Sequence, residues 1–339
     1  MSLNGNSTFI IAEAGVNHNG NLDAALALVD AAASAGADAV KFQTFKAEGV
    51  VTANAGKAEY QQRTTGSSEG QLAMLRRLQL SRDDNRAIAA RAAEQGIRFL
   101  SSAFDLESLA FLESLGVDPV KIASGEITNL PFLRAAGALG RETLLSTGMA
   151  ELDEVRAALD ALEAAGTPRD KIVVLQCNTE YPTPHADANL RAMLTMQREL
   201  GVRVGYSDHT VGIEAALAAV ALGACVIERH FTLDTNASGP DHAASADPEE
   251  LALLVRSVRN VEAALGNGVK TPSPSELPNL HIARRYLVAA KPIRKGEPFA
   301  PDNLTAKRTG ALGVNPMLWD SYMGKPADRD YQPDEAIKP

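Results

Sequence analysis

Short runs of β-branched and other apolar residues alternate along the chain with longer, Ala-rich stretches of helical periodicity. Eight strand-like runs precede residue 232, at 9–14, 39–43, 98–102, 120–124, 143–147, 172–177, 203–208 and 225–231. The clearest amphipathic stretches are 22–36, 82–96, 106–116, 130–140 and 152–166, and each ends in Gly. Because Gly is a common helix stop, these stretches read as complete helices. Such alternation predicts parallel strands joined by helical crossovers.

Eight strand–helix units over roughly 250 residues match the size of a (β/α)₈ TIM barrel. The alternative for such a pattern is an open, doubly wound sheet. A dinucleotide-binding sheet of that kind carries Gly-x-Gly-x-x-Gly after its first strand. The segment EAGVNHNGN (13–21) stands there and does not fit. We therefore predict an α/β protein built on a TIM barrel.

One connection in the predicted barrel is unusually long. Residues 47–71, within the segment that joins the second and third strands, show no helical pattern. Long ordered loops at the C-terminal end of a barrel usually cover or shape a binding site. We expect this connection to do so.

The alternation of strand-like and helical stretches stops after residue 265. Residues 266–280 (GNGVKTPSPSELPNL) have the Gly, Pro and Ser of a linker. The tail from 283 to 339 contains short strand-like runs, a close turn at KGEPF and the chain's one tryptophan, Trp319. We predict a barrel domain over 1–265, a linker over 266–282 and a small, mostly β domain over 283–339.

Composition and charge restrict the function classes. The net charge is −9 and the pI about 5.3, which gives no electrostatic basis for binding nucleic acid. Any anionic substrate must therefore be held by local lysines and arginines. The two cysteines, Cys177 and Cys225, predict no disulfide framework. The N-terminal residues show no secretion signal and the apolar run 215–227 is too short to cross a bilayer. We expect a cytoplasmic protein without a membrane partner.

All eight predicted strands end in polar residues, although their interiors are apolar. In a TIM barrel these C-terminal ends converge on the catalytic face. One such polar position means little, but eight on one face indicate a site, and they argue against a sugar-binding protein without catalysis. The residues are Glu13, Lys41, Gln43, Ser101, Ser102, Lys121, Ser124, Glu126, Ser146, Thr147, Asn178, Thr179, Tyr181, Ser207, Asp208, His209, Glu228 and His230.

Two histidines, His209 and His230, end the seventh and eighth strands. Neighbouring strands lie about 4.8 Å apart, so both imidazoles can reach one metal ion, with Glu13 and Asp241 expected nearby. Imidazole combined with oxygen ligands suits Mn²⁺, Zn²⁺ or Fe²⁺ better than Mg²⁺. The alternative is a pair of hydrogen-bonded core histidines. His18, after the first strand, could support the ligands from outside, and we assign no role to His185, His242 or His281.

Two lysines, Lys41 and Lys121, end the second and fourth strands and point to the same face. With the hydroxyls of Ser102, Ser124, Ser146 and Ser207 they can bind a phosphate or a carboxylate. The rival interpretation is a metal-independent Schiff-base aldolase, against which the paired histidines argue.

Glu126 follows the lysine strand and is our candidate for general acid–base catalysis. The alternative is an acid at the start of the next helix. Cys177 has no histidine placed to activate it and reads as a packed thiol.

Eight motifs occur in the order that is typical of one enzyme family. They are IIAEAGVNHNG (10–20), KFQTFKA (41–47), KIASGEITNLP (121–131), LSTGMA (145–150), CNTEYPTP (177–184), VGYSDHT (204–210), IERHFTLD (227–234) and SGPDH (238–242). Together they resemble the nonulosonate synthases, which make sialic acid and its bacterial relatives. The tail segment 284–308 resembles the antifreeze-like (SAF) domain that ends those enzymes. The resemblance extends from residue 9 over essentially the whole chain.

The resemblance implies a bacterial synthase that condenses phosphoenolpyruvate with an N-acylated mannose-type sugar and water, and releases phosphate. N-acetylmannosamine would give N-acetylneuraminate. The alternative acceptor is 2,4-diacetamido-2,4,6-trideoxymannose, which would give N,N'-diacetyllegionaminate. The motifs are close to both, and they leave the acceptor open.

The resemblance also implies roles for individual residues. Mn²⁺ or Mg²⁺ would lie between His209 and His230, and Glu126 would manage the protons, with Glu13 as a second carboxylate. Phosphoenolpyruvate would be held by Lys41, Lys121, Ser102, Ser124, Ser146, Ser207 and one of Asn178 and Thr179. Gln43, Tyr181, Asp241 and Arg308 would face the sugar. The tail domain would cross to the partner's barrel in a domain-swapped homodimer, so that Arg308 reaches the acyl group.

Overall fold

The structure is a computed structural model that describes residues 7–66 and 69–338. The N-terminal residues 1–6, for which we expect no secretion signal, lie outside the described part. Two compact units are present, Met1–Gly266 and Asn267–Pro339. Within the described residues, no helix is long and apolar enough to cross a membrane.

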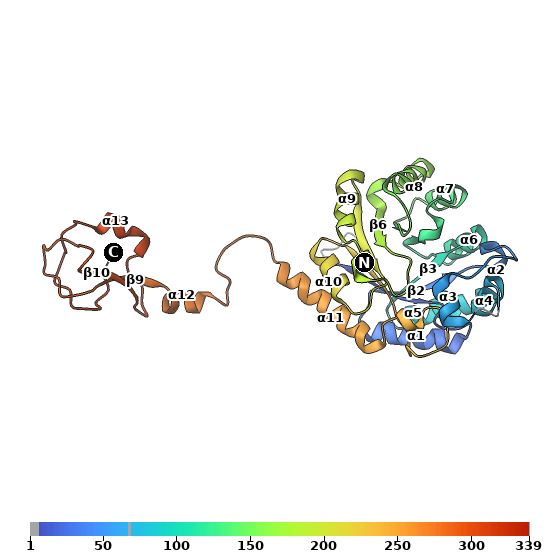
Figure 1. Cartoon of the computed structure of the whole chain (residues 1–339), viewed down its shortest axis with the longest axis horizontal. Coiled ribbons are helices and arrows are strands. Elements are labelled where there is room, and N and C mark those ends of the chain that lie inside the picture. The colour runs from blue at the N-terminus through green and yellow to red at the C-terminus, as the bar shows by residue number, and fades with distance from the viewer. Residues whose placement is uncertain (1–6, 67–68, 339) are drawn as a thin grey trace. The chain divides into compact units, whose positions relative to one another are not determined.

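The first unit is the predicted barrel. Its parallel strands close in the order β1 to β8, with β1 pairing both β2 and β8. Figure 1 shows this unit with its helices around the strands. The strands are β1 (Phe9–Gly15), β2 (Ala39–Thr44), β3 (Arg98–Ala103), β4 (Val120–Ile122), β5 (Thr143–Ser146), β6 (Ile172–Cys177), β7 (Arg203–Asp208) and β8 (Val226–His230). Nearly every strand position is buried, because one face meets the barrel interior and the other the helices.

The fourth strand is shorter than its predicted range of 120–124. It ends at Ile122, and residues Ser124–Glu126 form a 3₁₀ turn, η1. This turn changes the direction of the chain just where the predicted site residues Ser124 and Glu126 lie.

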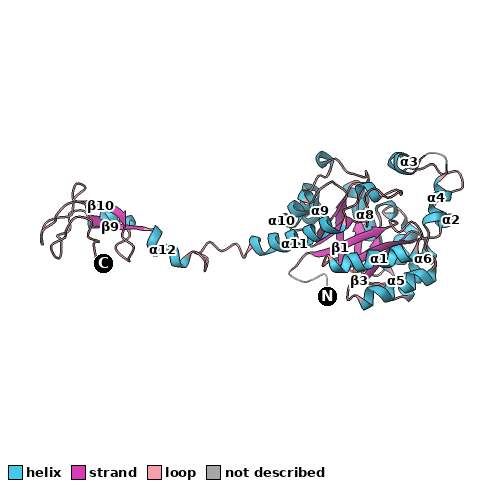
Figure 2. Ribbon diagram, turned by 90° about the horizontal axis from the view of Figure 1, so that it is seen from below, coloured by secondary structure: helices cyan, strands magenta, loops and turns pink. Residues whose placement is uncertain are grey.

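Helices cover the outside of the barrel, as Figure 2 shows. They are α1 (Leu22–Ser34), α5 (Arg82–Glu94), α6 (Leu106–Ser114), α7 (Leu130–Gly137), α8 (Leu152–Ala165), α9 (Arg191–Leu200), α10 (Glu214–Ala221) and α11 (Pro248–Leu265). Helix α8 buries Val155, Ala158, Leu159 and Leu162, an i, i+3, i+4, i+7 stripe. The N-cap side chain of α6, Asp105, accepts a hydrogen bond from the backbone N–H of Ser108.

The long connection between β2 and β3 is more ordered than the sequence predicted. It contains α2 (Ala47–Val50), α3 (Glu59–Thr65) and α4 (Gln71–Leu78) before α5. Two of these helices, α2 and α3, fall in the segment where we saw no helical pattern. They are only 4 and 7 residues long, too short for a period of 3.6 to show in the sequence.

The second unit is a small fold with its own core. Strands β9 (Arg285–Ala289) and β10 (Leu304–Arg308) pair antiparallel, and a short helix, α13 (Trp319–Tyr322), follows. Leu287, Ile293, Phe299 and Tyr331 are buried together, with Trp319 against them. Part of the segment predicted as linker forms α12 (Leu277–Ala283).

Candidate active site

A cavity of about 460 Å³ opens where the barrel strands end. Its floor is made by side chains from all eight barrel strands, including Cys177 of β6, and its side by the connection between β2 and β3. The size is that of a typical small-molecule site. The long connection therefore shapes the cavity, as the sequence predicted.

Two lysines and two carboxylates form one buried network on the floor. Lys41 Nζ lies 2.7 Å from Glu13 Oε2 and 3.8 Å from Glu228 Oε2, and Lys121 Nζ lies 3.4 Å from Glu228 Oε1. All four residues are at most 4% exposed. Since buried charges must be paired, each ion depends on the others to remain charged.

The network shifts the pKa values of its members. Burial raises the pKa of Glu13 to about 7, although Lys41 opposes the shift. Burial favours the proton on Glu228 as well, but Lys121 and Lys41 outweigh it and lower the pKa of Glu228. Burial lowers the pKa of Lys121, whereas Glu13 and Glu228 overcome the effect of burial on Lys41 and raise its pKa. Glu13 is therefore the carboxylate closest to neutrality, the range in which proton transfer is efficient.

Hydroxyl groups surround the ammonium groups. Lys41 donates to Ser102 Oγ at 3.1 Å and Lys121 donates to Ser146 Oγ at 2.9 Å. Ser207 Oγ donates to Glu228 Oε1 at 3.1 Å. These three serines line the cavity with the two lysines. The arrangement can bind an anion of the size of a carboxylate or phosphate.

Ser124 also lines the cavity, but its hydroxyl is held by the backbone. The N–H of Gly148 donates to Ser124 Oγ at 2.9 Å. A Cβ at Gly148 would lie 2.7 Å from Thr179 Cγ2 and 2.9 Å from Ser124 Oγ, so no larger residue fits. Glycine at this position allows the strand-four and strand-five ends to approach.

The two predicted metal-binding histidines lie side by side at the ends of β7 and β8. Their ring centroids are 5.2 Å apart, and Tyr181 stacks on His209 at 4.2 Å. His209 Nδ1 donates to the Asn178 carbonyl at 2.5 Å, because a carbonyl can only accept, which leaves Nε2 for a ligand. His230 Nδ1 is buried without a hydrogen-bond partner among the described residues.

The chemistry of the pair suits a metal ion in part. Burial lowers the pKa of His230 well below its usual value and keeps it neutral, the form that binds metals. Burial also disfavours the charged form of His209, but the negative charge of the Cys177 thiolate outweighs it and raises the pKa of His209. Cys177 Sγ lies 3.9 Å from His209 Nδ1, so the expectation that no histidine lies beside Cys177 was wrong. No group of three or more His, Cys, Asp or Glu side chains is poised for a metal in the described ranges. The described structure thus brings two imidazole groups together, and their binding of a metal stays a prediction.

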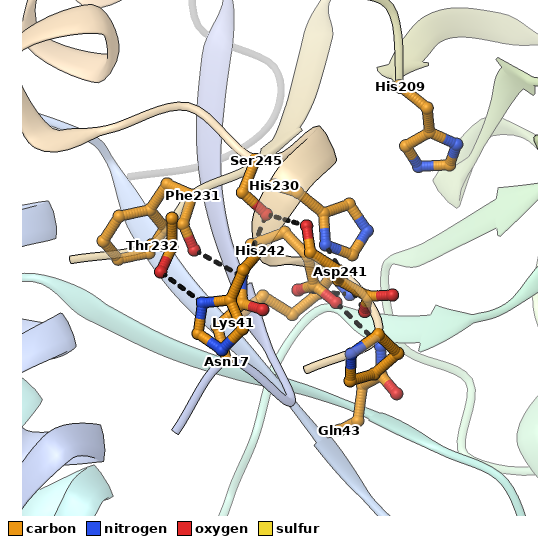
Figure 3. Close-up of polar contacts among 12 residues, drawn as sticks. Asn17, Lys41, Gln43, His209, His230, Phe231, Thr232, Asp241, His242 and Ser245 are labelled. Atoms are coloured by element: carbon orange, nitrogen blue, oxygen red, sulfur yellow. Dashed lines mark hydrogen bonds and ion pairs between the residues drawn. The ribbon is translucent and has the colours of Figure 1, made fainter. Parts of the chain in front are cut away.

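The loop after β8 places Asp241 at the cavity. Asp241 Oδ2 lies 4.0 Å from His230 Nδ1, and burial raises the pKa of Asp241 to about 6. Ser245 Oγ donates to the Asp241 carbonyl at 2.7 Å, and Asn17 Nδ2 donates to Ser245 Oγ at 2.9 Å (Figure 3). Thr232 Oγ1 and His242 Nδ1 share a 2.7 Å hydrogen bond. His242 therefore helps to hold the loop that carries Asp241.

Alternation along β8 explains the charges at its end. Glu228 and His230 face the cavity, whereas Arg229 between them faces the other way. Arg229 Nη1 pairs with Asp208 Oδ2 at 3.3 Å and donates to the Thr210 carbonyl. This buried ion pair connects the ends of β7 and β8 and does not contribute to the cavity.

The remaining predicted site residues divide into two groups. Gln43, Tyr181 and Thr179 line the cavity, and Gln43 Nε2 donates to Glu13 Oε1 at 3.3 Å. Asn178 does not line it in the described structure: its side chain accepts from the Glu180 N–H at 2.8 Å. Arg308 lies exposed at the end of β10, in the second unit.

Glu126 is half-buried beside the cavity, next to Gly125, which lines it. Glu126 Oε2 accepts from Asn129 Nδ2 at 2.6 Å, and Asn129 is the N-cap of α7. Burial raises the pKa of Glu126, against the effect of Asn129. The contacts resemble the alternative interpretation, an acid near a helix start, and its catalytic role stays a prediction.

Both Glu228 and Tyr60 line the cavity. Sequence reasoning placed Glu228 on the catalytic face without a specific role, and its bridging of the two lysines emerged only in the structure. Tyr60, on α3, lies 5.0 Å from Tyr181 between ring centroids. No sequence signal marked Tyr60, because a short loop helix places it.

Comparison with known proteins extends the picture to the whole chain. The NeuB family matches residues 28–270, and the SAF domain matches residues 284–339. The N,N'-diacetyllegionaminic acid synthase of Campylobacter jejuni is 49% identical over 98% of this chain and 99% of its own length. The synthase of the same name from Legionella pneumophila is 47% identical over 93% of this chain and 89% of its own.

A solved structure agrees with this assignment. The N-acetylneuraminic acid synthetase of Leptospira borgpetersenii, crystallised with citrate, aligns with a TM-score of 0.71 at 35% identity, covering 81% of this chain and 91% of its own. The chain therefore belongs to the NeuB family of nonulosonate synthases and ends in a SAF domain.

Proposed function

We propose that this nonulosonate synthase makes N,N'-diacetyllegionaminate from phosphoenolpyruvate, 2,4-diacetamido-2,4,6-trideoxymannose and water. The supporting observation is the near full-length similarity to two N,N'-diacetyllegionaminic acid synthases, at 49% and 47% identity. Human N-acetylneuraminate-9-phosphate synthase is 36% identical. The comparisons thus favour the alternative acceptor of the sequence analysis over N-acetylmannosamine.

The anionic substrate would lie against the lysine network. Lys41 and Lys121 bind the carboxylate and phosphate of phosphoenolpyruvate, with Ser102, Ser146 and Ser207 as hydrogen-bond partners. The overall charge of −9 repels an anion, so these two lysines supply the attraction locally.

The reaction forms one carbon–carbon bond. C3 of phosphoenolpyruvate attacks the aldehyde carbon of the open-chain sugar, whose oxygen becomes an alkoxide. Water adds to the cationic C2 and gives up a proton to the Glu13 carboxylate, which passes it to the alkoxide; the raised pKa of about 7 lets Glu13 accept and return protons near neutrality. The tetrahedral C2 then loses phosphate by C–O cleavage, and its hydroxyl becomes the keto group as the hydroxyl proton leaves with the phosphate. Gln43, Tyr181 and Asp241 orient the sugar from the cavity wall.

A divalent cation would be held by His209 Nε2 and His230 Nδ1, the latter buried without a hydrogen-bond partner in the described structure. When bound, such an ion supplies Lewis-acid polarisation of the aldehyde. We propose Mn²⁺ or Mg²⁺ for this position, with imidazole donors favouring Mn²⁺.

Phosphate release tests the proposal. The purified protein is incubated with phosphoenolpyruvate and either 2,4-diacetamido-2,4,6-trideoxymannose or N-acetylmannosamine, with Mn²⁺ or with chelator. We expect release with the diacetamido sugar that chelator abolishes and Mn²⁺ restores. Preference for N-acetylmannosamine would make the product a sialic acid instead. Turnover that persists with chelator would show that the reaction needs no metal ion.

A further inference from the structure

One side of the cavity differs in chemistry from its floor. We call it the apolar wall: Val50, Leu75 and Phe104 are half-buried and face the cavity, and Met74 and Leu78 are buried beside them. None of these five side chains can accept or donate a strong hydrogen bond. The floor, by contrast, carries two lysines and two carboxylates.

Four of the five side chains of the apolar wall come from the long connection. Val50 ends α2, Leu75, Met74 and Leu78 come from α4, and these helices lie together at one side of the barrel in both views (Figures 1 and 2). Phe104 follows β3 and packs edge-on to Phe45 at 6.3 Å between centroids. The barrel thus supplies the charged floor, while the connection supplies all of the apolar wall except Phe104.

Only one part of the two reactants matches the apolar wall in chemistry. Phosphoenolpyruvate carries a carboxylate and a phosphate, which belong with the lysines. The aldehyde end of the acceptor must also reach the floor, since it is the carbon attacked. The far end of the proposed acceptor carries the C6 methyl and the methyl of the C4 acetamido group, which are apolar.

We infer that the apolar wall binds the methyl-bearing far end of the acceptor and that Leu75 is a specificity-determining residue against a C6 hydroxyl. This inference rests on the proposed function. A methyl group gains from contact with the wall, whereas a hydroxyl there loses its hydrogen bonds to water without replacement. Apolar pockets of this kind discriminate against an added hydroxyl by roughly 100-fold at most.

The test compares two acceptors that differ at one atom. Values of kcat/KM are measured, at saturating phosphoenolpyruvate, for 2,4-diacetamido-2,4,6-trideoxymannose and for the same sugar with a C6 hydroxyl. We expect the wild type to favour the 6-deoxy sugar by roughly 10- to 100-fold. In Leu75→Gln, whose amide can pair with a hydroxyl, the ratio of kcat/KM for the 6-deoxy sugar to that for the C6-hydroxyl sugar should fall by roughly fivefold or more. The KM for phosphoenolpyruvate should be unchanged.

A matched control lies on the same helix. Leu72→Gln makes the same chemical change on α4 at a half-buried position outside the cavity lining, and it should leave the ratio at the wild-type value. If Leu75→Gln is unstable, Val50→Thr carries the same test, because it adds a hydroxyl to the apolar wall with almost no change of shape.

The outcomes separate the two proposals. The inference is wrong if the wild type turns over both acceptors without preferring the 6-deoxy sugar, or if Leu75→Gln slows both acceptors equally. In either case the apolar wall does not contact the C6 end of the acceptor. The second result would fit a wall covered by another part of the protein. If the wild type does not use 2,4-diacetamido-2,4,6-trideoxymannose at all, the proposed function itself fails.

Discussion

Glu228 is the residue whose replacement tests the charge network most directly. Its carboxylate lies 3.4 Å from Lys121 Nζ and 3.8 Å from Lys41 Nζ, and Ser207 donates to it. At these separations each attraction amounts to about 4 to 5 kcal/mol at an effective dielectric constant of about 20. Glu228→Gln keeps the shape of the side chain and removes the charge that both lysines share.

The expected consequence is a large loss of stability in the free enzyme. Removing one partner from a buried ion pair costs about 3–5 kcal/mol, because the remaining charge stays desolvated. In a barrel of this size each kcal/mol corresponds to about 2–4 °C in Tm. We therefore expect the barrel transition of Glu228→Gln to fall by about 6 °C or more. Lys121, whose pKa burial already lowers, should then titrate at still lower pH.

Phosphoenolpyruvate should reverse much of this loss. In the variant the bound anion is the new counter-charge for the lysines, so the ligand raises Tm by more than it does in the wild type. The assay is thermal unfolding with and without a fixed excess of phosphoenolpyruvate. Glu163→Gln, which breaks an exposed 3.1 Å pair with Arg169, is the control and should change stability by about 1 kcal/mol or less. An unchanged Tm for Glu228→Gln, or equal ligand shifts in variant and wild type, would refute the charge-sharing argument.

Two further predictions concern the chemistry and the tail. Glu13→Gln should lower kcat by about 100-fold or more. In the wild type, kcat/KM should fall as the pH drops below about 7, because Glu13, whose pKa is raised to about 7, is protonated there and loses its carboxylate form. Stopped assays from pH 5.5 to 8.5 check this, and an acidic limb that persists in the variant would assign it to another group. Arg308→Ala should raise the KM for the acceptor far more than the KM for phosphoenolpyruvate if the exposed Arg308 reaches a partner's site; equal changes would count against that role.

The sequence by itself determined the barrel and the face on which its chemistry lies. Short apolar runs in the strands, Ala-rich helices and Gly stops are local features, so each predicted strand appears within a few residues of its range. Polar residues at the strand ends could be assigned to one face because parallel strands in a closed barrel all end there. His209, His230, Lys41 and Lys121 accordingly line one cavity.

Only the tertiary structure decided which of those groups share charge and what surrounds them. Glu228 lies between two lysines from other strands because barrel closure brings β8 beside β1, a contact between residues more than 200 positions apart. Val50 and Tyr60 are placed by α2 and α3, which are too short to leave a clear period in the sequence. Local patterns fix which way a side chain points along its own strand, whereas closure and loop packing fix what it meets.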